Sequence, residues 1–244
     1  MFQRNRIYIQ PEEQEKIKNC KLLIAGAGLG SNIAECALRI GFENITICDM
    51  DNVEQSNLNR QNYTNADIGT SKSESLFQRL KAVNPEAQMQ CNNVFLTQNN
   101  SEEYIKNCNI AINTIDFTSE IPFIFDDICI KHNVPVLHPF NLGWAGCLFV
   151  INKNSRNLQD IVADYQTAEQ KIVEHIINNC NKNENIDWLT QALQTFKLEN
   201  GKMPPPQLAP ASWLTAGICT NLLYQLTTNK PIKVFPDFYF LTTL

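Results

Sequence analysis

The sequence predicts an α/β fold in which a Rossmann-like, mainly parallel sheet carries helices on both faces. Between residues 21 and 140, short apolar runs alternate with segments of helical periodicity, and this order is typical of a wound parallel sheet. The glycine-rich stretch GAGLGS (26–31) joins the first apolar run to a helix. Two of the apolar runs end in an aspartate, so acidic side chains are expected at the edge of the sheet where ligands bind.

The elements of this core follow one another in a regular order. Pro11 and the acids after it predict a short helix over residues 11–19. Short apolar runs predict strands at 21–26, 44–49, 108–116 and 134–140, with a weaker one at 87–94. Apolar residues at helical spacing predict helices at 32–41, 71–84 and 121–133.

The pattern changes after about residue 150. Residues 158–180 and 186–196 each carry an apolar stripe at helical spacing, which predicts helices packed on the sheet or, alternatively, a surface for a partner. The proline-rich stretch 201–210 is expected to form a rigid, exposed connector. An apolar helix at 211–228 and a strand region at 232–243 follow, and Pro236 favours an edge position for that strand.

We therefore expect a single domain over residues 1–244. It divides into a nucleotide-binding core (1–150), a helical elaboration or crossover segment (151–210) and a C-terminal helix and strand (211–244). A chain of 244 residues that is 43% hydrophobic is long enough to bury a large core.

Composition limits the classes of function. A net charge of -5 and a pI near 5.3 argue against binding nucleic acid through bulk electrostatics. The chain has no apolar run of about 18 residues, and its first residues lack the features of a signal peptide, so we expect a cytoplasmic protein without a membrane segment. Nine cysteines, none spaced as CxxC, predict free thiols and no structural zinc.

The glycine-rich stretch indicates a nucleotide. Gly26, Gly28 and Gly30 stand at a strand-to-helix turn, where glycine lets the backbone approach a phosphate and the helix supplies free N–H groups. Asp49 follows the second strand 21 residues after Gly28, a position from which a carboxylate accepts hydrogen bonds from a ribose. These residues alone do not distinguish ATP from NAD.

The long polar loop DNVEQSNLNRQNY (51–63) favours ATP. Arg60 in this loop and Lys72 at the next helix would bring two cations to the phosphates. Asp116 falls at the same edge of the sheet, where it is suited to hold Mg²⁺. Two cations and a metal neutralise the charge of a reacting triphosphate. An NAD-dependent oxidoreductase, the alternative on this sheet, has no need of them.

The stretch DMDNVEQSNLNRQNY, followed by DIGTSKSES, resembles the signature of the ThiF/MoeB/HesA family, the bacterial relatives of the E1 enzymes that activate ubiquitin. The resemblance covers residues 1–150 well and the C-terminal region more loosely. It implies an enzyme that binds ATP and Mg²⁺ and transfers AMP to the C-terminal carboxylate of a small ubiquitin-like or sulfur-carrier protein ending in Gly-Gly, with release of pyrophosphate.

The resemblance also implies roles for individual residues. Asp49 matches the acid that binds ribose, Lys72 the phosphate-binding lysine and Asp116 the magnesium-binding aspartate. In the polar loop, the residues expected to contact ATP are Asp51, Asn57, Arg60 and Gln61. Arg6 matches an arginine of the N-terminal arm that acts on the other protomer's ATP, so the resemblance implies a homodimer.

Three departures from the family pattern leave the acceptor open. The glycine turn is one residue short, Phe117 stands where the family has Asn, and the CxxC zinc pair is missing. Relatives without zinc include enzymes that activate a modified tRNA base or a peptide, and a non-catalytic binding protein is a further alternative. If a cysteine receives the activated group, Cys180 in its polar surroundings is the candidate.

Overall fold

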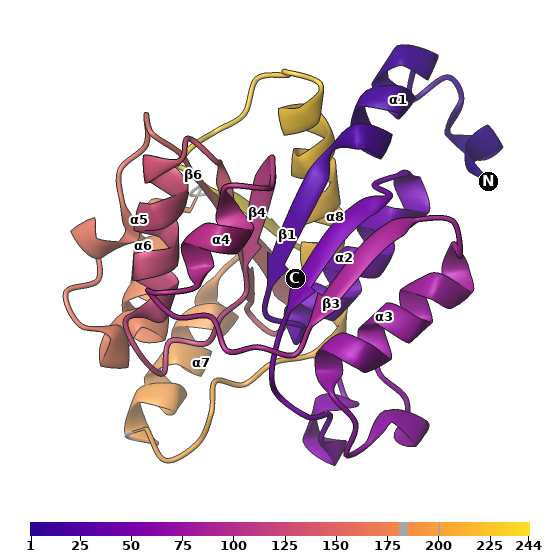
Figure 1. Cartoon of the computed structure of the whole chain (residues 1–244). Helices are drawn as coiled ribbons and strands as arrows, with labels where there is room; N and C mark the ends of the chain where they lie inside the picture. Colours follow the sequence, from indigo (N-terminus) through magenta and orange to yellow (C-terminus); the bar gives the residue numbers. More distant parts are fainter. Residues whose placement is uncertain (181–184, 200) are drawn as a thin grey trace.

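The computed structural model in Figure 1 describes residues 1–180, 185–199 and 201–244. A mixed sheet runs through it in the order β3-β2-β1-β4-β5-β6-β7. The first five of these strands are parallel to one another. The strand β6 pairs antiparallel with β5, and β7 pairs antiparallel with β6. The strands are β1 (Lys21–Ala25), β2 (Asn44–Cys48), β3 (Gln88–Asn92), β4 (Ile110–Asn113), β5 (Val136–Asn141), β6 (Ala145–Ile151) and β7 (Tyr239–Thr242).

Helices cover both faces of the sheet (Figure 1). On one face α2 and α3 join α8, and on the other face α4 and α5 join α6 and α7. The α-helices are α1 (Pro11–Asn19), α2 (Leu29–Ile40), α3 (Lys72–Val83), α4 (Ser101–Ile105), α5 (Ile121–Lys131), α6 (Ala168–Asn179), α7 (Asp187–Leu198) and α8 (Ala209–Thr227). The predicted fold class is therefore confirmed.

Side chains alternate between the two faces along the central strands, which explains why two hydrophobic cores form. In β1, Leu22 and Ile24 belong to the core under α2 and α8, whereas Leu23 and Ala25 belong to the core under α5. Successive side chains of a strand point to opposite faces, so a strand that is apolar throughout must be covered twice. This requirement accounts for the near-continuous apolar runs of the parallel strands.

The strand order creates a switch point between β1 and β4. From β1 the chain proceeds outward through β2 to β3, and from β4 it proceeds the other way through β5. Ligands of open α/β sheets bind beyond the carboxyl ends of the strands at such a point. The glycine turn after β1 and the segment after β4 that contains Asp116 both lie there.

The structure corrects the prediction for residues 158–180. The helix α6 covers only Ala168–Asn179, and two 3-10 turns, Leu158–Asp160 and Tyr165–Thr167, precede it. The side chains of Asp160 and Asp164 accept hydrogen bonds from nearby backbone N–H groups, and such local bonds compete with helix formation. The apolar residues before Ala168 thus have helical spacing without forming a helix.

Further findings concern elements outside the predicted pattern. The strand β6 and the short helix α4 were not predicted. The strand β7 lies at the edge of the sheet, as Pro236 before it indicates. Residues 181–184 and 200 of the predicted helical elaboration lie outside the described residues. Within the part of the chain that the structure describes, every helix is too short or too polar to cross a bilayer.

Candidate active site

The glycine turn between β1 and α2 has a backbone that only glycine adopts without strain. Gly26 has a φ of +94°, in the left-handed region that other residues avoid. A Cβ at Gly26 would lie 2.6 Å from the carbonyl oxygen of Thr114. The turn therefore packs directly against the segment that follows β4, and the free N–H groups at the start of α2 remain at the carboxyl edge.

Asp49 ties the glycine turn to the polar loop. Its carboxylate accepts the backbone N–H of Ala27 at 2.5 Å and that of Asp51 at 2.7 Å. Burial raises the pKa of Asp49, while the Ala27 N–H and the charge of Lys72 act in the opposite direction. Asp49 thus organises the site besides the ribose-binding role that its position predicts.

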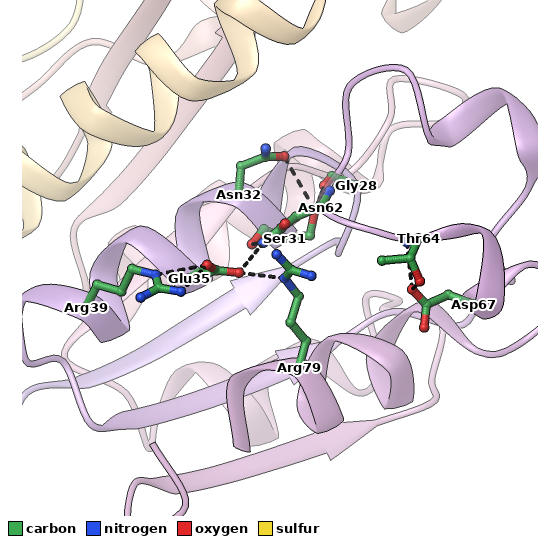
Figure 2. A network of polar contacts seen from close by, with 9 residues as sticks. All are labelled: Gly28, Ser31, Asn32, Glu35, Arg39, Asn62, Thr64, Asp67 and Arg79. Carbon is green, nitrogen blue, oxygen red and sulfur yellow. Dashed lines mark hydrogen bonds and ion pairs between the residues drawn. The ribbon is translucent and has the colours of Figure 1, made fainter. Parts of the chain in front are cut away.

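An ionic network around the buried acid Glu35 fixes the end of the polar loop to two helices (Figure 2). The Asn62 side-chain amide donates to Glu35 at 2.6 Å, and the Asn62 backbone N–H donates to the Ser31 hydroxyl at 2.9 Å. Glu35 also accepts from Arg39 of α2 and from Arg79 of α3, at 2.7 and 2.5 Å. Because Asn62 stands two residues after Arg60, this network sets where the loop's arginine lies.

Figure 2 also shows how the chain leaves this network. Thr64 donates to the Asp67 carboxylate through both its backbone N–H and its hydroxyl, each at 2.7 Å. The Tyr63 hydroxyl lies 2.7 Å from the carbonyl oxygen of Ala27 and 3.2 Å from that of Lys72. Tyr63 therefore joins the glycine turn to the start of α3.

Lys72 is the first residue of α3 and is held over the edge of the sheet. Its side chain is only 10% exposed, and its ammonium group donates to Asp51 at 2.9 Å. Asp51 also accepts the Lys72 backbone N–H at 2.8 Å. Asp51 therefore holds the predicted phosphate-binding lysine in place through two bonds.

Asp116 is exposed three residues beyond β4. The protein around its carboxyl group raises the pKa by desolvation, and the charges of Lys72 and Arg60 act to lower it, whereas Asp51 raises it further. Mutual electrostatic influence requires proximity, so the structure brings together Arg60, Lys72, Asp51 and Asp116.

Asn57 and Gln61 shape the loop near the glycine turn. Asn57 is buried and accepts the Glu54 N–H at 2.9 Å, which stabilises a 3-10 turn. The amide nitrogen of Gln61 lies 3.1 Å from where a Cβ of Gly28 would be. Its side-chain oxygen is buried, with no hydrogen-bond partner among the described residues. The side-chain oxygen of Gln61 is thus an unpaired acceptor beside the turn.

The donor set at Asp116 fits Mg²⁺ that is bound together with a substrate. Within residues 1–180, 185–199 and 201–244, no three His, Cys, Asp or Glu side chains form a group that could hold a metal by themselves. Mg²⁺ is usually bound through one or two carboxylates plus phosphate oxygens and water. Asp116, an exposed carboxylate, can supply the protein's share of such a set.

Arg6 and Cys180 lie away from the other predicted site residues. Asn5, beside Arg6, donates to the carbonyl oxygen of Ile40 at the C-terminal end of α2, about 18 Å along this 12-residue helix from the glycine turn. Cys180 follows the last residue of α6, whereas the charge of Asp116 acts on Glu169 in the first turn of that helix. Within one protomer, therefore, neither Arg6 nor Cys180 lies close to Asp116.

The sequence reasoning missed several residues of the site. Glu35 and Asn62 form the buried network, Tyr63 joins the turn to α3, and Gln207 binds Arg60. A buried acid in an amphipathic helix was a usable signal for Glu35, because such an acid requires partners. Nothing local in the sequence links Gln207 to a loop 147 residues away.

Comparison with known proteins agrees with this geometry. The sequence profile of the ThiF family matches residues 2–243. The chain belongs to the ThiF family. This membership confirms the resemblance found in the polar loop, and the family match extends over the C-terminal segments as well.

Two curated relatives resemble part of this ThiF-family chain. The sulfur carrier protein ThiS adenylyltransferase of Bacillus subtilis is 32% identical over 147 residues, which are 59% of this chain and 44% of the relative. The sulfur carrier protein adenylyltransferase of Thermus thermophilus is 33% identical over 110 residues, 44% of this chain and 41% of the relative. The chain thus spans less than half the length of these relatives.

Solved structures share the fold of this ThiF-family chain almost throughout. MccB of E. coli, solved with ATP, has a TM-score of 0.69 at 18% identity and covers 94% of this chain and 66% of its own. PaaA has a TM-score of 0.69 at 20% identity over 95% of this chain and 72% of its own. These identities support a common fold alone.

Proposed function

We propose that this protein is an ATP-dependent adenylyltransferase. It activates the C-terminal carboxylate of a small ubiquitin-like or sulfur-carrier protein as an acyl-adenylate and releases pyrophosphate. The observation that supports this proposal most is the pair of cations, Arg60 and Lys72, whose charges act on Asp116 at the switch point of a ThiF-family sheet.

ATP would occupy the carboxyl edge between β1 and β4. Gly26, Gly28 and Gly30 allow the backbone to approach the nucleotide, and the start of α2 supplies N–H donors. Asp49, which is bonded to the turn, would bind the ribose, and the loop would carry Arg60 over the phosphates. The remaining ATP-binding residues of this proposal are Asp51, Asn57 and Gln61.

Charge neutralisation accounts for the proposed chemistry. A C-terminal carboxylate is already ionised at neutral pH, so attack needs no general base. Its oxygen forms a bond to the α-phosphorus while the bond to the β-phosphate oxygen breaks and pyrophosphate leaves. Arg60 and Lys72, with Arg6 of a second protomer, would offset the repulsion between carboxylate and triphosphate. Asp116 would hold Mg²⁺, which supplies further positive charge to the phosphates when bound.

The proposal includes a homodimer in the cytoplasm and a single domain over residues 1–244. The assignment of 1–150 to nucleotide binding agrees with the positions of Asp49, Arg60, Lys72 and Asp116. Cys180, at the far end of α6, is not supported as the group that receives the acyl chain within the same protomer.

Intact-mass spectrometry of an acceptor incubated with ATP and Mg²⁺ tests the proposal. We expect a small β-grasp protein ending in Gly-Gly to gain the mass of AMP. A peptide and a modified tRNA are tested separately. If only one of them gains AMP and the Gly-Gly protein does not, that molecule carries the carboxylate that the enzyme activates. Thermal stabilisation by NAD and not by ATP would contradict adenylation altogether.

A further inference from the structure

The connector 201–210 reaches the predicted catalytic loop. The Gln207 side-chain oxygen accepts the Nε–H of Arg60 at 2.5 Å. The Gln207 backbone carbonyl also lies 3.3 Å from the side-chain amide nitrogen of Asn59, which donates to it. Two bonds therefore join this segment to adjacent residues of the loop.

The connector is anchored on its other side at the sheet. Asn141, the last residue of β5, is 8% exposed. Its amide nitrogen donates to the Leu208 carbonyl at 2.8 Å and to the Ser212 hydroxyl at 2.9 Å, and its oxygen accepts the Leu208 N–H at 3.3 Å. A buried amide with three such bonds fixes the residue next to Gln207. Gln207 thus extends from a rigid point at the start of α8.

These bonds divide the donors of Arg60 into two groups. A guanidinium has five N–H donors in a fixed plane. Nε is bound by Gln207, and Nη1 donates to the Ser56 carbonyl at 3.0 Å and to the Asn59 side-chain oxygen at 2.8 Å. The two N–H groups of Nη2 make no hydrogen bond within the described part of the chain. They are the donors left for a ligand.

We propose that Gln207 is a positioning residue for Arg60. By holding Nε from a rigid segment, it fixes the plane of the guanidinium and directs Nη2 to the phosphates. The inference rests on the proposed adenylation, because it assumes that Arg60 acts on the triphosphate. It assigns to the connector, 147 residues away in the sequence, a part in the reaction that no local motif indicates.

The kinetic test compares Gln207→Met with Arg60→Lys in pyrophosphate exchange. Met keeps the length of the side chain without an acceptor, and we expect kcat to fall about 10-fold while KM for ATP changes less than about 3-fold. Because Lys has no Nε–H, Gln207→Met should have no further effect in the Arg60→Lys background. Gln194→Ala, at an exposed position of α7, is the control and should leave both constants unchanged. Equal losses in both backgrounds, or an unchanged or raised kcat in the single variant, would overturn the proposal.

A second measurement begins with the unaltered protein, in which folding is not in question. Arginine labelled with ¹⁵N reports the exchange of the Arg60 Nε–H with water. We expect this proton to stay protected when a non-hydrolysable ATP analogue binds, and to lose protection in Gln207→Met. Loss of protection on binding the analogue would show that Gln207 is displaced, which contradicts a positioning role. If the analogue does not bind at all, the proposed function itself fails, so the two failures are distinct.

Discussion

At the scale of the residue, the site combines cations that are held in advance with a carboxylate, Asp116, whose pKa is raised by desolvation. Lys72 is buried and bonded to Asp51 at 2.9 Å, and Arg60 is held through three of its donors. Groups fixed before the substrate arrives need little reorganisation in the transition state. The two cations should therefore affect the rate more than nucleotide binding.

Removing either cation tests this conclusion. We expect Arg60→Ala and Lys72→Ala each to lower the rate of adenylation at least about 100-fold, which corresponds to about 2.7 kcal/mol of barrier. The reason is that each substitution leaves charge on the triphosphate unbalanced as the carboxylate approaches. Exchange of labelled pyrophosphate into ATP measures the effect. Lys153→Ala, at an exposed lysine beyond β6, should leave the rate unchanged, and a comparable loss there would indicate only a general effect of charge.

The ionised carboxylate of Asp116 should lower the stability of the folded protein, although the proposed function needs it. Desolvation raises its pKa, so ionisation is less favourable in the folded chain than in the unfolded one. We expect Asp116→Asn to raise the melting temperature at pH 7. The difference from wild type should shrink as pH falls through the raised pKa and vanish below the ordinary value of about 3.9, where both side chains are neutral.

Glu74→Gln is the control of opposite sign, because hydrogen bonds from Gln78 and Cys91 lower the pKa of Glu74. It should not raise the melting temperature at pH 7. If Asp116→Asn lowers the melting temperature at pH 7, the carboxylate stabilises the fold and the assignment of its pKa shift is wrong.

At the scale of the element, one buried acid joins α2, α3 and the polar loop. Burial acts to raise the pKa of Glu35, but hydrogen bonds from Asn62, Arg39 and Arg79 outweigh it and lower the pKa. The ionised form is therefore the one that the fold stabilises. Through Asn62, the same carboxylate holds the loop that carries Arg60.

Glu35→Gln should lower both stability and activity. We expect a loss of about 1–3 kcal/mol in the free energy of unfolding at pH 7, measured by urea denaturation. The contribution of Glu35 is present above its ordinary pKa, about 4.3, and is lost as pH falls through the lowered value. The difference between variant and wild type should therefore diminish in acid.

The exposed pair of Arg156 and Asp160 provides the comparison for this loss. Asp160→Asn should cost less than about 1 kcal/mol, because solvent screens the pair. Equal losses for Glu35→Gln and Asp160→Asn would show that the network in Figure 2 has no special role.

Several elements could be predicted from the sequence, and the exceptions have physical causes. Four of the five parallel strands follow from short apolar runs that must be covered on both faces, whereas β3 is largely polar and lies at the edge of the sheet. The helix expected from residue 158 begins only at Ala168, because Asp160 and Asp164 bond to nearby backbone. The strand β6 follows β5 after only three residues and was not predicted.

The site was predictable where it follows strand ends and not where the fold brings distant segments together. Asp49 and Asp116 come directly or shortly after β2 and β4, so the sheet itself places them at one edge. Gln207 reaches Arg60 only because Asn141 anchors the start of α8. No periodicity in the sequence contains that information.

At the scale of the whole molecule, the distance of Arg6 from the glycine turn favours a role for Arg6 at the ATP of a second protomer. The N-terminal arm packs at the end of α2 opposite to the glycine turn. Arg6 is exposed, and within residues 1–180, 185–199 and 201–244 its guanidinium donates only to the Gln3 carbonyl. If Arg6 contacts ATP, the nucleotide must therefore belong to a second copy of the chain.

Mixing two inactive variants tests this arrangement. Arg6→Ala and Arg60→Ala should each be inactive as homodimers. In a mixed dimer, the Arg6→Ala protomer keeps its own Arg60 and receives Arg6 from its partner, so about one quarter of all sites should regain activity. Light scattering after gel filtration should show twice the chain mass of 27.8 kDa. A monomer, or a mixture as inactive as its parts, would contradict action in trans.

The central claim is tested most directly by pyrophosphate exchange into ATP, measured in wild type and in Asp116→Ala. The assay uses a Gly-Gly acceptor that gains AMP in wild type. If the site splits ATP between its α- and β-phosphates with Asp116 holding Mg²⁺, wild type exchanges label only when the acceptor is present. The variant should then lose at least about 100-fold in rate, or about 2.7 kcal/mol of transition-state stabilisation. Near-normal exchange in Asp116→Ala, or cleavage of ATP to ADP and phosphate in wild type, would contradict the account.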